Sequence, residues 1–473
     1  MSESSVAAGV RLGEWGLQRV RALALAEPVG QVLAIALCGS VLLLPAIWNG
    51  FPITFYDTGA YLHQGLLDHF IVERSPVYSF FLRFGGAAES LWWIVILQAA
   101  MTAFVMAETA RALRPNMSVA VFLGIAALLT VATGLPWYVG QIEPDGFAAI
   151  AVLSAYLLAF HAPALGRVRV ALLIFIAALA TGAHPSHLGL TAGLAICAAV
   201  YALVSRKSDW PRANAALPAA GFALGLGLVL AANYHFTDDI FISRAGPDFE
   251  FARLVQDGIA KRDLDAICPT VHLKLCPYRN QFPKTADEWL WSDSPFNNAL
   301  MRFEGTAAES QYVVRDSLVR LPWANLKAAV FDAATQFASF ATGDQIEPQA
   351  WILYPDIRRA IPRQLDAYMH SRQQEDEIAF GPINIVHEPI GWLGLIGIVA
   401  GLVLAIRARA RRQAILFGVV LTALIGNAVI CGVMSNPHNR YQSRLIWLPV
   451  FALCLAGPPR AIAFLRAPPE SVT

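Results

Sequence analysis

The sequence has few charged residues. Only 15% of its 473 residues are Asp, Glu, Lys or Arg, whereas 56% are hydrophobic and the mean hydropathy is +0.50. Soluble globular chains carry about 25% charged residues, so the composition argues against a soluble protein and indicates a polytopic membrane protein. The net charge of +1 gives no reason to expect nucleic acid as a partner.

Several familiar motifs are also missing. The chain has no Gly-x-x-x-x-Gly-Lys-Ser/Thr loop and no Gly-x-Gly-x-x-Gly motif after a strand, which argues against a soluble nucleotide-sugar fold. Residues 1–28 have no apolar stretch followed by an Ala-x-Ala site, so we expect the first hydrophobic segment to act as a signal anchor. No internal repeat with a period of about 20–50 residues is visible.

What the chain does contain is a series of long apolar segments. Each is close to the ~20 residues that a helix needs to cross a bilayer, which predicts an all-α polytopic fold with a bundle of about ten transmembrane helices. The predicted spans are residues 31–48, 91–110, 117–133, 146–162, 169–183, 188–204, 214–232, 389–406, 414–433 and 445–460.

Lys and Arg are distributed unevenly between the connections. They gather near both ends of the chain and in alternate loops, for example at Arg167 and Arg169, while the short loops 134–145 and 184–187 contain neither. The positive-inside rule therefore predicts that both termini are cytoplasmic. This topology and the Ala-rich spans suit a bacterial cytoplasmic membrane.

The predicted spans divide the chain into three parts. Residues 1–232 form an N-terminal transmembrane module with spans one to seven, and residues 389–473 form a C-terminal module with the last three. Residues 233–388 hold nearly all of the charge-dense sequence and are long enough to fold as a domain. We expect this segment to be a mostly helical soluble domain on the external, periplasmic face, on the same side as loops 49–90 and 134–145.

Two of the six cysteines lie in the predicted external domain. Cys268 and Cys276 are expected to form a disulfide in an oxidising compartment. The alternative is a metal site that also uses His272. The other four cysteines fall inside predicted spans, where we expect them to pack as small apolar residues.

Acidic residues stand at the external ends of the predicted spans. Asp57 follows span one, and Glu143 and Asp145 precede span four. These carboxylates could supply a general base, and Asp57 and Asp145 could instead bind a divalent cation. The structural alternatives are an Asx-turn at Asp57, a helix N-cap at Asp145 and headgroup water around Glu143.

Imidazole and guanidinium groups stand on the same predicted face. They belong to His184, His187, His438, Arg440 and Arg444. Because the arginine fork matches phosphate geometry, this set could bind a phosphate or pyrophosphate. Alternatively, His184 and His187 satisfy backbone groups at a helix break, and Arg440 and Arg444 reach towards lipid headgroups.

These motifs resemble those of the GT-C superfamily of membrane glycosyltransferases, in particular the branch of protein O-mannosyltransferases and lipid A aminoarabinose transferases. That branch has an acidic residue in the first external loop, then a Tyr, then a Pro-x-Tyr element. Its second external loop carries an acid at the start of span four, and its last loop often carries an Arg-Tyr pair. The matching residues are Asp57, Tyr61, Pro76-Val77-Tyr78, Glu143-Pro144-Asp145-Gly146 and Arg440-Tyr441, with His438 just before.

The sequence departs from the branch at two places. Thr58 follows Asp57 where a second acid is common, and the third external loop reads His184-Pro185-Ser186-His187 where a Lys is often found.

The resemblance implies a sugar donor linked to polyprenyl phosphate and an acceptor that is an envelope glycan, a lipid or a protein. Asp57 would be the catalytic base, and Asp145 or Glu143 would orient the acceptor or help to hold a divalent cation. The residues implied in substrate binding are Tyr61, His63, Tyr78, His184, His187, His438, Arg440, Tyr441 and Arg444, of which the arginines and histidines would stabilise the departing phosphate.

Three other functions remain open from the sequence. The first is a ligase for lipid-linked glycans, which would use a related donor. The second is a transporter or flippase, although transporters usually place polar residues near the middle of the membrane. The third is a non-catalytic scaffold with a GT-C-like fold.

Overall fold

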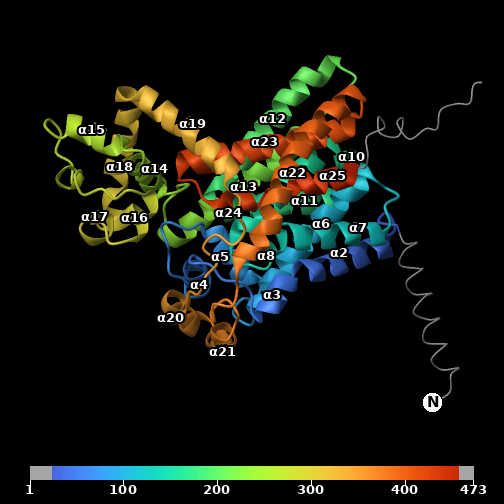
Figure 1. The fold of residues 1–473 in the computed structure, drawn as a ribbon, viewed down its shortest axis with the longest axis horizontal. Helices are drawn as coiled ribbons and strands as arrows, with labels where there is room; N and C mark the ends of the chain where they lie inside the picture. The colour runs from blue at the N-terminus through green and yellow to red at the C-terminus, as the bar shows by residue number, and fades with distance from the viewer. Residues whose placement is uncertain (1–23, 457–473) are drawn as a thin grey trace, which may run out of the picture.

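The computed structural model describes residues 24–456, and within that range the chain is helical and contains no β-strand (Figure 1). Most of the apolar helices form one bundle, and a smaller group of helices lies beyond one end of it, at the left in Figure 1. The bundle helices are α2 (Pro28–Leu42), α3 (Leu44–Asn49), α6 (Leu91–Leu113), α7 (Val119–Ala132), α9 (Phe147–Phe160), α10 (Ala162–Leu165), α11 (Arg167–Ala183), α12 (Pro185–Val204), α13 (Ala216–Thr237), α22 (Phe380–Arg407), α23 (Arg411–Met434) and α25 (Trp447–Ala456).

Five helices of the described chain are long and apolar enough to cross a membrane. They are α6, α12 with the 3₁₀ turn that extends it to Lys207, α13, α22 and α23. Helices α2, α7 and α9 are apolar but shorter. The architecture is therefore that of an all-helical protein with several apolar helices, which fits a multi-pass membrane protein.

Each of the ten predicted spans overlaps a helix within residues 24–456, although residues 457–460 of the tenth lie outside the described residues and not all of the helices have the expected length. The first is divided into α2 and α3, because Pro45 lacks the N–H that would continue the helix. Helix α22 begins at Phe380, so the predicted domain boundary at residue 388 lies inside a helix. The count of ten spans stays a prediction.

A buried ionic cluster joins three helices of the bundle. The Glu108 side chain on α6 is fully buried and lies 2.5 Å from Nη2 of Arg111 and 3.0 Å from Nε of Arg169 on α11. Gln31 on α2 donates to Glu108 and accepts a hydrogen bond of 2.8 Å from Arg169. Burying a carboxylate is costly unless it is paired in this way, so this cluster ties α2, α6 and α11 together.

The predicted external segment contains two groups of helices with different cores. Phe251, Leu264, Trp289 and Phe296 belong to a separate hydrophobic core, whereas Leu353 and Tyr368 belong to the core of the bundle. The helices of the first group are α14 (Gly246–Gln256), α15 (Ile259–Ile267), α16 (Ala286–Trp291), α17 (Pro295–Asn298) and α18 (Arg302–Arg320); α19 (Pro322–Ala338) leads from them to α23, and α20 (Ala350–Ala360) and α21 (Leu365–Met369) form the second group.

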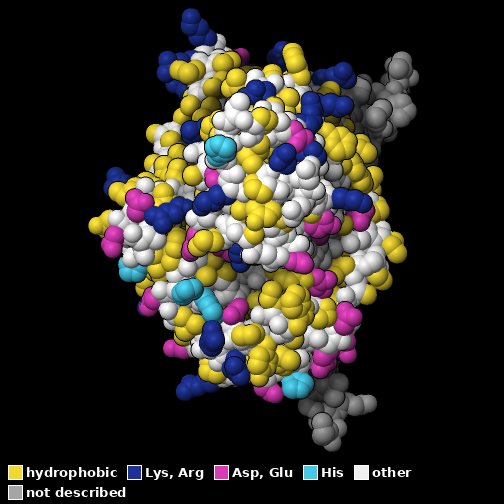
Figure 2. Space-filling model, turned by 90° about the vertical axis from the view of Figure 1, so that its left-hand side faces the viewer, with side chains coloured by type: hydrophobic (Ala, Val, Ile, Leu, Met, Phe, Trp, Pro, Cys, Tyr) yellow, Lys and Arg dark blue, Asp and Glu magenta, His cyan; other side chains and the backbone are white. Residues whose placement is uncertain are grey.

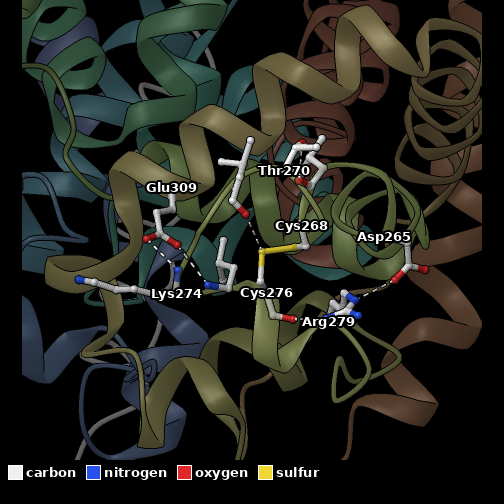
Figure 3. The surroundings of a disulfide bond; sticks show 10 residues. Asp265, Cys268, Thr270, Lys274, Cys276, Arg279 and Glu309 are labelled. Atoms are coloured by element: carbon white, nitrogen blue, oxygen red, sulfur yellow. Dashed lines mark hydrogen bonds and ion pairs between the residues drawn. A yellow bond between two sulfur atoms is a disulfide. The ribbon is translucent and has the colours of Figure 1, made fainter.

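A disulfide joins Cys268 and Cys276 in the first of these groups (Figure 3). Their Cα atoms are 5.7 Å apart. The Glu309 carboxylate on α18 accepts hydrogen bonds from the backbone N–H groups of Lys274 at 3.0 Å and Leu275 at 3.1 Å, which fixes the disulfide loop on α18. Because both sulfur atoms are in the disulfide, neither is free to bind a metal with His272.

We predict that Glu108→Ala lowers the free energy of unfolding by about 2 kcal/mol, because it leaves the partly buried guanidinium groups of Arg111 and Arg169 without their carboxylate. Thermal denaturation of the purified full-length protein in detergent measures this. Glu89→Ala, which removes an exposed Glu, is the control. Equal melting temperatures for both variants would show that the cluster adds nothing to stability.

Candidate functional site

Backbone pairing brings two distant loops together at one end of the bundle. Ile53 forms a parallel β-bridge with Gln141, in which Ile53 N–H donates to Gly140 O at 2.9 Å and Ile142 N–H donates to Ile53 O at 2.8 Å. The Thr58 hydroxyl adds a bond of 3.0 Å to Ile142 O. These bonds place the first loop, which carries Asp57, against the loop that carries Glu143.

Short helices hold the site at this end, between the bundle and the external helices in Figure 1. They are α4 (Thr58–Leu66), α5 (Pro76–Phe84), α8 (Leu135–Val139), η1 (Pro144–Gly146) and α24 (Asn439–Ser443). Prolines open α5, α8 and η1, where the missing N–H costs nothing. The first loop is therefore a folded part of the site.

The three acids that the sequence singles out lie close together and are each about nine-tenths buried or more. Asp57 precedes α4, but its side chain makes no capping bond and instead pairs with Arg74. Asp145 lies within η1 and pairs with Arg444. Both oxygen atoms of Glu143 are buried without a hydrogen-bond partner in the protein.

The two arginines of the last external loop differ in how they are held. Arg444 is fully buried, and besides Asp145 it donates to Ser186 Oγ at 2.9 Å and to Asn427 Oδ1 at 3.0 Å, so it does not reach towards lipid headgroups. Arg440 Nη1 lies 3.8 Å from both Glu143 Oε1 and Asp145 Oδ2 and has no hydrogen-bond partner. Arg444 therefore holds the site together, while Arg440 has free donors.

The position of Arg440 is fixed by aromatic rings rather than by close ion pairs. Its guanidinium carbon lies 4.5 Å from the centroid of the Phe55 ring and 4.7 Å from that of Tyr441. Cation–π contacts of this kind hold a guanidinium while leaving its edge N–H groups available. The arrangement presents Arg440 Nη1 to the space beside Glu143.

The environment of Glu143 changes its acidity. Burial raises the pKa of this carboxyl well above its usual range, the nearby charges of Asp57 and Asp145 raise it further, and Arg440 and Arg74 lower it. A buried carboxyl with a raised pKa and no partner in a cluster of charged groups is typical of functional sites. Glu143 is therefore the acid of this cluster best suited to carry a proton at neutral pH.

Two tyrosines lie beside the acids. The rings of Tyr61 on α4 and Tyr78 on α5 are 4.8 Å apart and meet edge to face. Tyr78 donates to Gln98 Oε1 at 2.8 Å, and Gln98 donates to Gln141 O at 2.8 Å, so this chain supports the loop that carries Glu143. The Tyr61 hydroxyl is buried and has no hydrogen-bond partner.

The loop between α11 and α12 joins the site through its serine. His184 precedes α12 and accepts a bond of 3.2 Å from Ser186 N–H, and Ser186 Oγ contacts Arg444. His187 is fully buried, and its Nδ1 lies 2.8 Å from Ala180 O, so this ring satisfies a backbone group as the structural alternative predicts. Burial lowers the pKa of His184 well below its usual range, as do His187 and Arg444. His184 is therefore a neutral hydrogen-bonding group at pH 7.

His438 connects the segment before α24 to the group of helices α14–α18. Its Nε2 lies 3.2 Å from Asp287 Oδ2 on α16, and its Nδ1 lies 3.7 Å from Asp344 Oδ2. Asp344 also accepts a bond of 3.1 Å from the backbone N–H of Arg440. His438 thus helps to position Arg440 and makes no direct contact with the three acids.

His63 belongs to a different contact. Its Nε2 lies 2.9 Å from Asp356 Oδ1 on α20, and no ion pair or hydrogen bond in the described chain links it to Asp57, Glu143 or Asp145. The structure brings the other predicted residues to the site or to its immediate support.

Sequence reasoning did not identify several residues that complete the site. Arg74 stands directly before Ser75 and the Pro76-Val77-Tyr78 motif, so its place beside a motif was the available signal. Ser186 has a similar signal, because it lies within the His184-Pro185-Ser186-His187 segment. Asp344 and Asn427 have none, because each reaches the site only through long-range packing.

The site offers little to a metal ion. Among residues 24–456, no three His, Cys, Asp or Glu side chains are grouped so that they could hold one. Asp57 and Asp145, the expected ligands, are each paired with an arginine instead.

Comparison with known proteins gives no relative. No family model, no curated protein and no solved structure matches this chain.

We predict a pH-dependent contact at His438. Burial lowers its pKa, but hydrogen bonds to Asp287 and Asp344 outweigh burial and raise the pKa from 6.5 to about 9. The stability from this contact is therefore complete below about pH 6.5 and is lost as the pH rises through about 9. Melting temperatures of His438→Gln should fall below wild type at pH 6.5 and match it at pH 9.5.

The matched control is His370→Gln, because the His370 side chain is 71% exposed. A constant difference between His438→Gln and wild type across this pH range would contradict the ionic contact.

Proposed function

We propose that this protein is a membrane glycosyltransferase of the GT-C type. It transfers a sugar from a polyprenyl-phosphate donor to an acceptor at the external face of a bacterial cytoplasmic membrane. The proposal is carried by one observation: three carboxylates and three guanidinium groups converge, largely buried, at one end of an apolar helical bundle. Acidic and basic groups in one site suit removal of a proton from an acceptor and stabilisation of a departing phosphate.

The arrangement of charges supports the proposed topology, in which ten helices span the membrane with both termini in the cytoplasm. Arg111 and Arg169 belong to the loops expected to be cytoplasmic, and they meet at Glu108. The disulfide lies in the segment assigned to the external, oxidising side. The acid cluster is then at the external surface, where a lipid phosphate would also lie.

The phosphate of the donor would bind to Arg440 and Arg74. Arg440 Nη1 has no hydrogen-bond partner, and Arg74 Nε is likewise buried without one. As the sugar leaves, negative charge develops on the phosphate oxygen, and guanidinium groups already held in place lower the barrier most. Arg444 serves a supporting role, because its side chain is fully buried and both of its Nη atoms are bound by Asp145, Ser186 and Asn427.

Asp57 would act as the base. Phosphate binding at Arg74 would compete with the Asp57–Arg74 pair and leave Asp57 free to accept a proton from the acceptor. The acceptor oxygen or nitrogen then forms a bond to the anomeric carbon while the bond from that carbon to the phosphate oxygen breaks. The products are the glycosylated acceptor and polyprenyl phosphate, and Asp57 holds the proton.

Glu143 and Asp145 would support this reaction. Protonated Glu143 would donate a hydrogen bond to the substrate. Asp145 would fix the position of Arg444 and, through it, of the segment that carries Arg440. Tyr61 would offer its unpartnered hydroxyl to the sugar. No step of this scheme requires a divalent cation.

We predict that Asp57→Asn lowers glycan transfer by about 10²–10⁴-fold, the contribution of a general base. The assay is transfer of labelled sugar from polyprenyl-phosphate donors in isolated membranes, at matched protein abundance. Asp68→Asn is the control, because Asp68 is an exposed acid of the same loop, paired with Arg83. Transfer at the wild-type rate by Asp57→Asn would refute the base assignment.

We predict that Arg440→Ala raises the KM for the donor by about tenfold or more, since a hydrogen bond to a charged group contributes roughly 1.5–3 kcal/mol. Arg83→Ala, which removes an exposed arginine, should leave the donor KM unchanged. An unaltered KM for Arg440→Ala would mean that Arg440 does not bind the donor phosphate.

A further inference from the structure

A large groove lies between the first loop and the external helices. Its volume is about 950 Å³, within the ~300–1,000 Å³ typical of ligand sites. One wall is residues 70–73, and the other is the segment from Met301 to Ala308, which includes the start of α18. The groove lies outside the acid cluster and takes no part in the proposed reaction steps.

The lining of the groove is chemically mixed. It carries the cations Arg244 and Arg302, the anions Glu73 and Glu304, the amide of Asn297 and the rings of Phe70 and Phe303. The positive and negative side chains are equal in number, so the groove does not favour a strongly charged ligand. Charged side chains along an apolar acyl chain would be left without partners, which disfavours a lipid tail.

The arginines of the groove contact aromatic rings and keep their side chains nearly half exposed, at 46% for Arg302 and 44% for Arg244. Arg302 lies over the rings of Phe303 and Trp291 at 5.5 and 5.7 Å, and its distance to Glu73 is 3.9 Å, too long for a hydrogen bond. Arg244 lies 4.3 Å from the centroid of the Phe241 ring and pairs with Asp239 at 2.8 Å. Accessible guanidinium donors, carboxylate acceptors and aromatic faces together suit a ligand rich in hydroxyl groups.

The backbone at the groove wall is in a sparsely populated conformation. Met301 and Arg302 are consecutive non-glycine residues with φ of 58° and 51°. Each such residue costs roughly 1–3 kcal/mol unless the surrounding structure enforces it. This turn places Arg302 and Phe303 on the groove.

The groove leads towards the proposed catalytic site. Val72 and Glu73 line both the groove and a smaller cavity, and the wall of that cavity includes Arg74. Arg74 in turn pairs with Asp57. A ligand in the groove would therefore lie along the first loop and approach the proposed base from the side of the external helices.

We propose that this groove binds the saccharide portion of the acceptor. Binding of a neutral, hydroxyl-rich glycan follows from the lining itself, and its role as acceptor rests on the proposed glycosyltransferase function. The view of the molecule from the side of the external helices agrees with this, because Lys and Arg are interspersed with Asp and Glu over that face (Figure 2).

The test is photo-cross-linking in the full-length protein in cell membranes. The probe is p-benzoylphenylalanine in place of Ala308, an exposed residue of the groove wall. Its control is the same probe in place of Ala266, an exposed residue of α15 outside the groove. Adducts are detected by periodate oxidation with hydrazide labelling and identified by mass spectrometry.

The expected result is a glycan adduct at position 308 and none at position 266. Arg302→Ala should lower its yield about fivefold, the effect of losing one hydrogen bond of roughly average strength. Only phospholipid adducts, only protein adducts, an adduct bearing polyprenyl phosphate, or no adduct at position 308 would each overturn the proposal.

The same probe in the Asp57→Asn variant separates this proposal from the proposed function. A glycan adduct that persists in this variant while transfer is lost supports both. A glycan adduct with undiminished transfer would refute the role of Asp57 and keep the saccharide site. Transfer that depends on Asp57, with no glycan adduct, would refute only the saccharide site.

Discussion

Neutralisation of buried charge is the constraint on which the site depends. A chain with so few charged residues places three carboxylates and three guanidinium groups at one end of an apolar bundle, where an unpaired charge is costly. Two pairs, Asp57–Arg74 and Asp145–Arg444, meet this requirement directly. The third pair makes no hydrogen bond, because Arg440 Nη1 and Glu143 Oε1 are 3.8 Å apart. Both residues have buried polar atoms without a hydrogen-bond partner. The incomplete pair marks where a substrate would complete the hydrogen bonding.

Helices α14–α18 and the bundle both hold the segment that carries Arg440. Asn427 on α23 and Ser186 on α12 bind Arg444 from within the bundle. His438, six residues before Arg444, binds Asp287 on α16. Movement of helices α14–α18 would therefore alter the position of Arg440, which lies between these two anchors, and in the proposed reaction this would couple donor binding to the approach of the acceptor.

Hydropathy and loop charge predicted where the helices lie and which polar residues gather at their ends, because both follow from local composition. The partners of those residues could not be predicted in the same way. Asp145 and Arg444 are separated by 299 positions, and no periodicity relates them. His63 looked like a neighbour of Asp57 in sequence, yet its helix turns it to Asp356. The division of segment 233–388 between two cores could not be predicted either. Composition indicates that a residue is buried but not which core it belongs to.

Thr58 shows how the charge balance of this site fits the proposed donor. Where the glycosyltransferases that the motifs resemble often have a second acid, Thr58 instead bonds to Ile142 O and fixes the loop. Burial raises the pKa of Glu143 and favours its neutral form, so within the cluster of three acids and three arginines the guanidinium groups outnumber the carboxylate charges. A sugar linked to polyprenyl phosphate is a phosphodiester with one negative charge. A second acid at position 58 would cancel the excess charge, so the threonine is consistent with a site that gains neutrality when the donor binds.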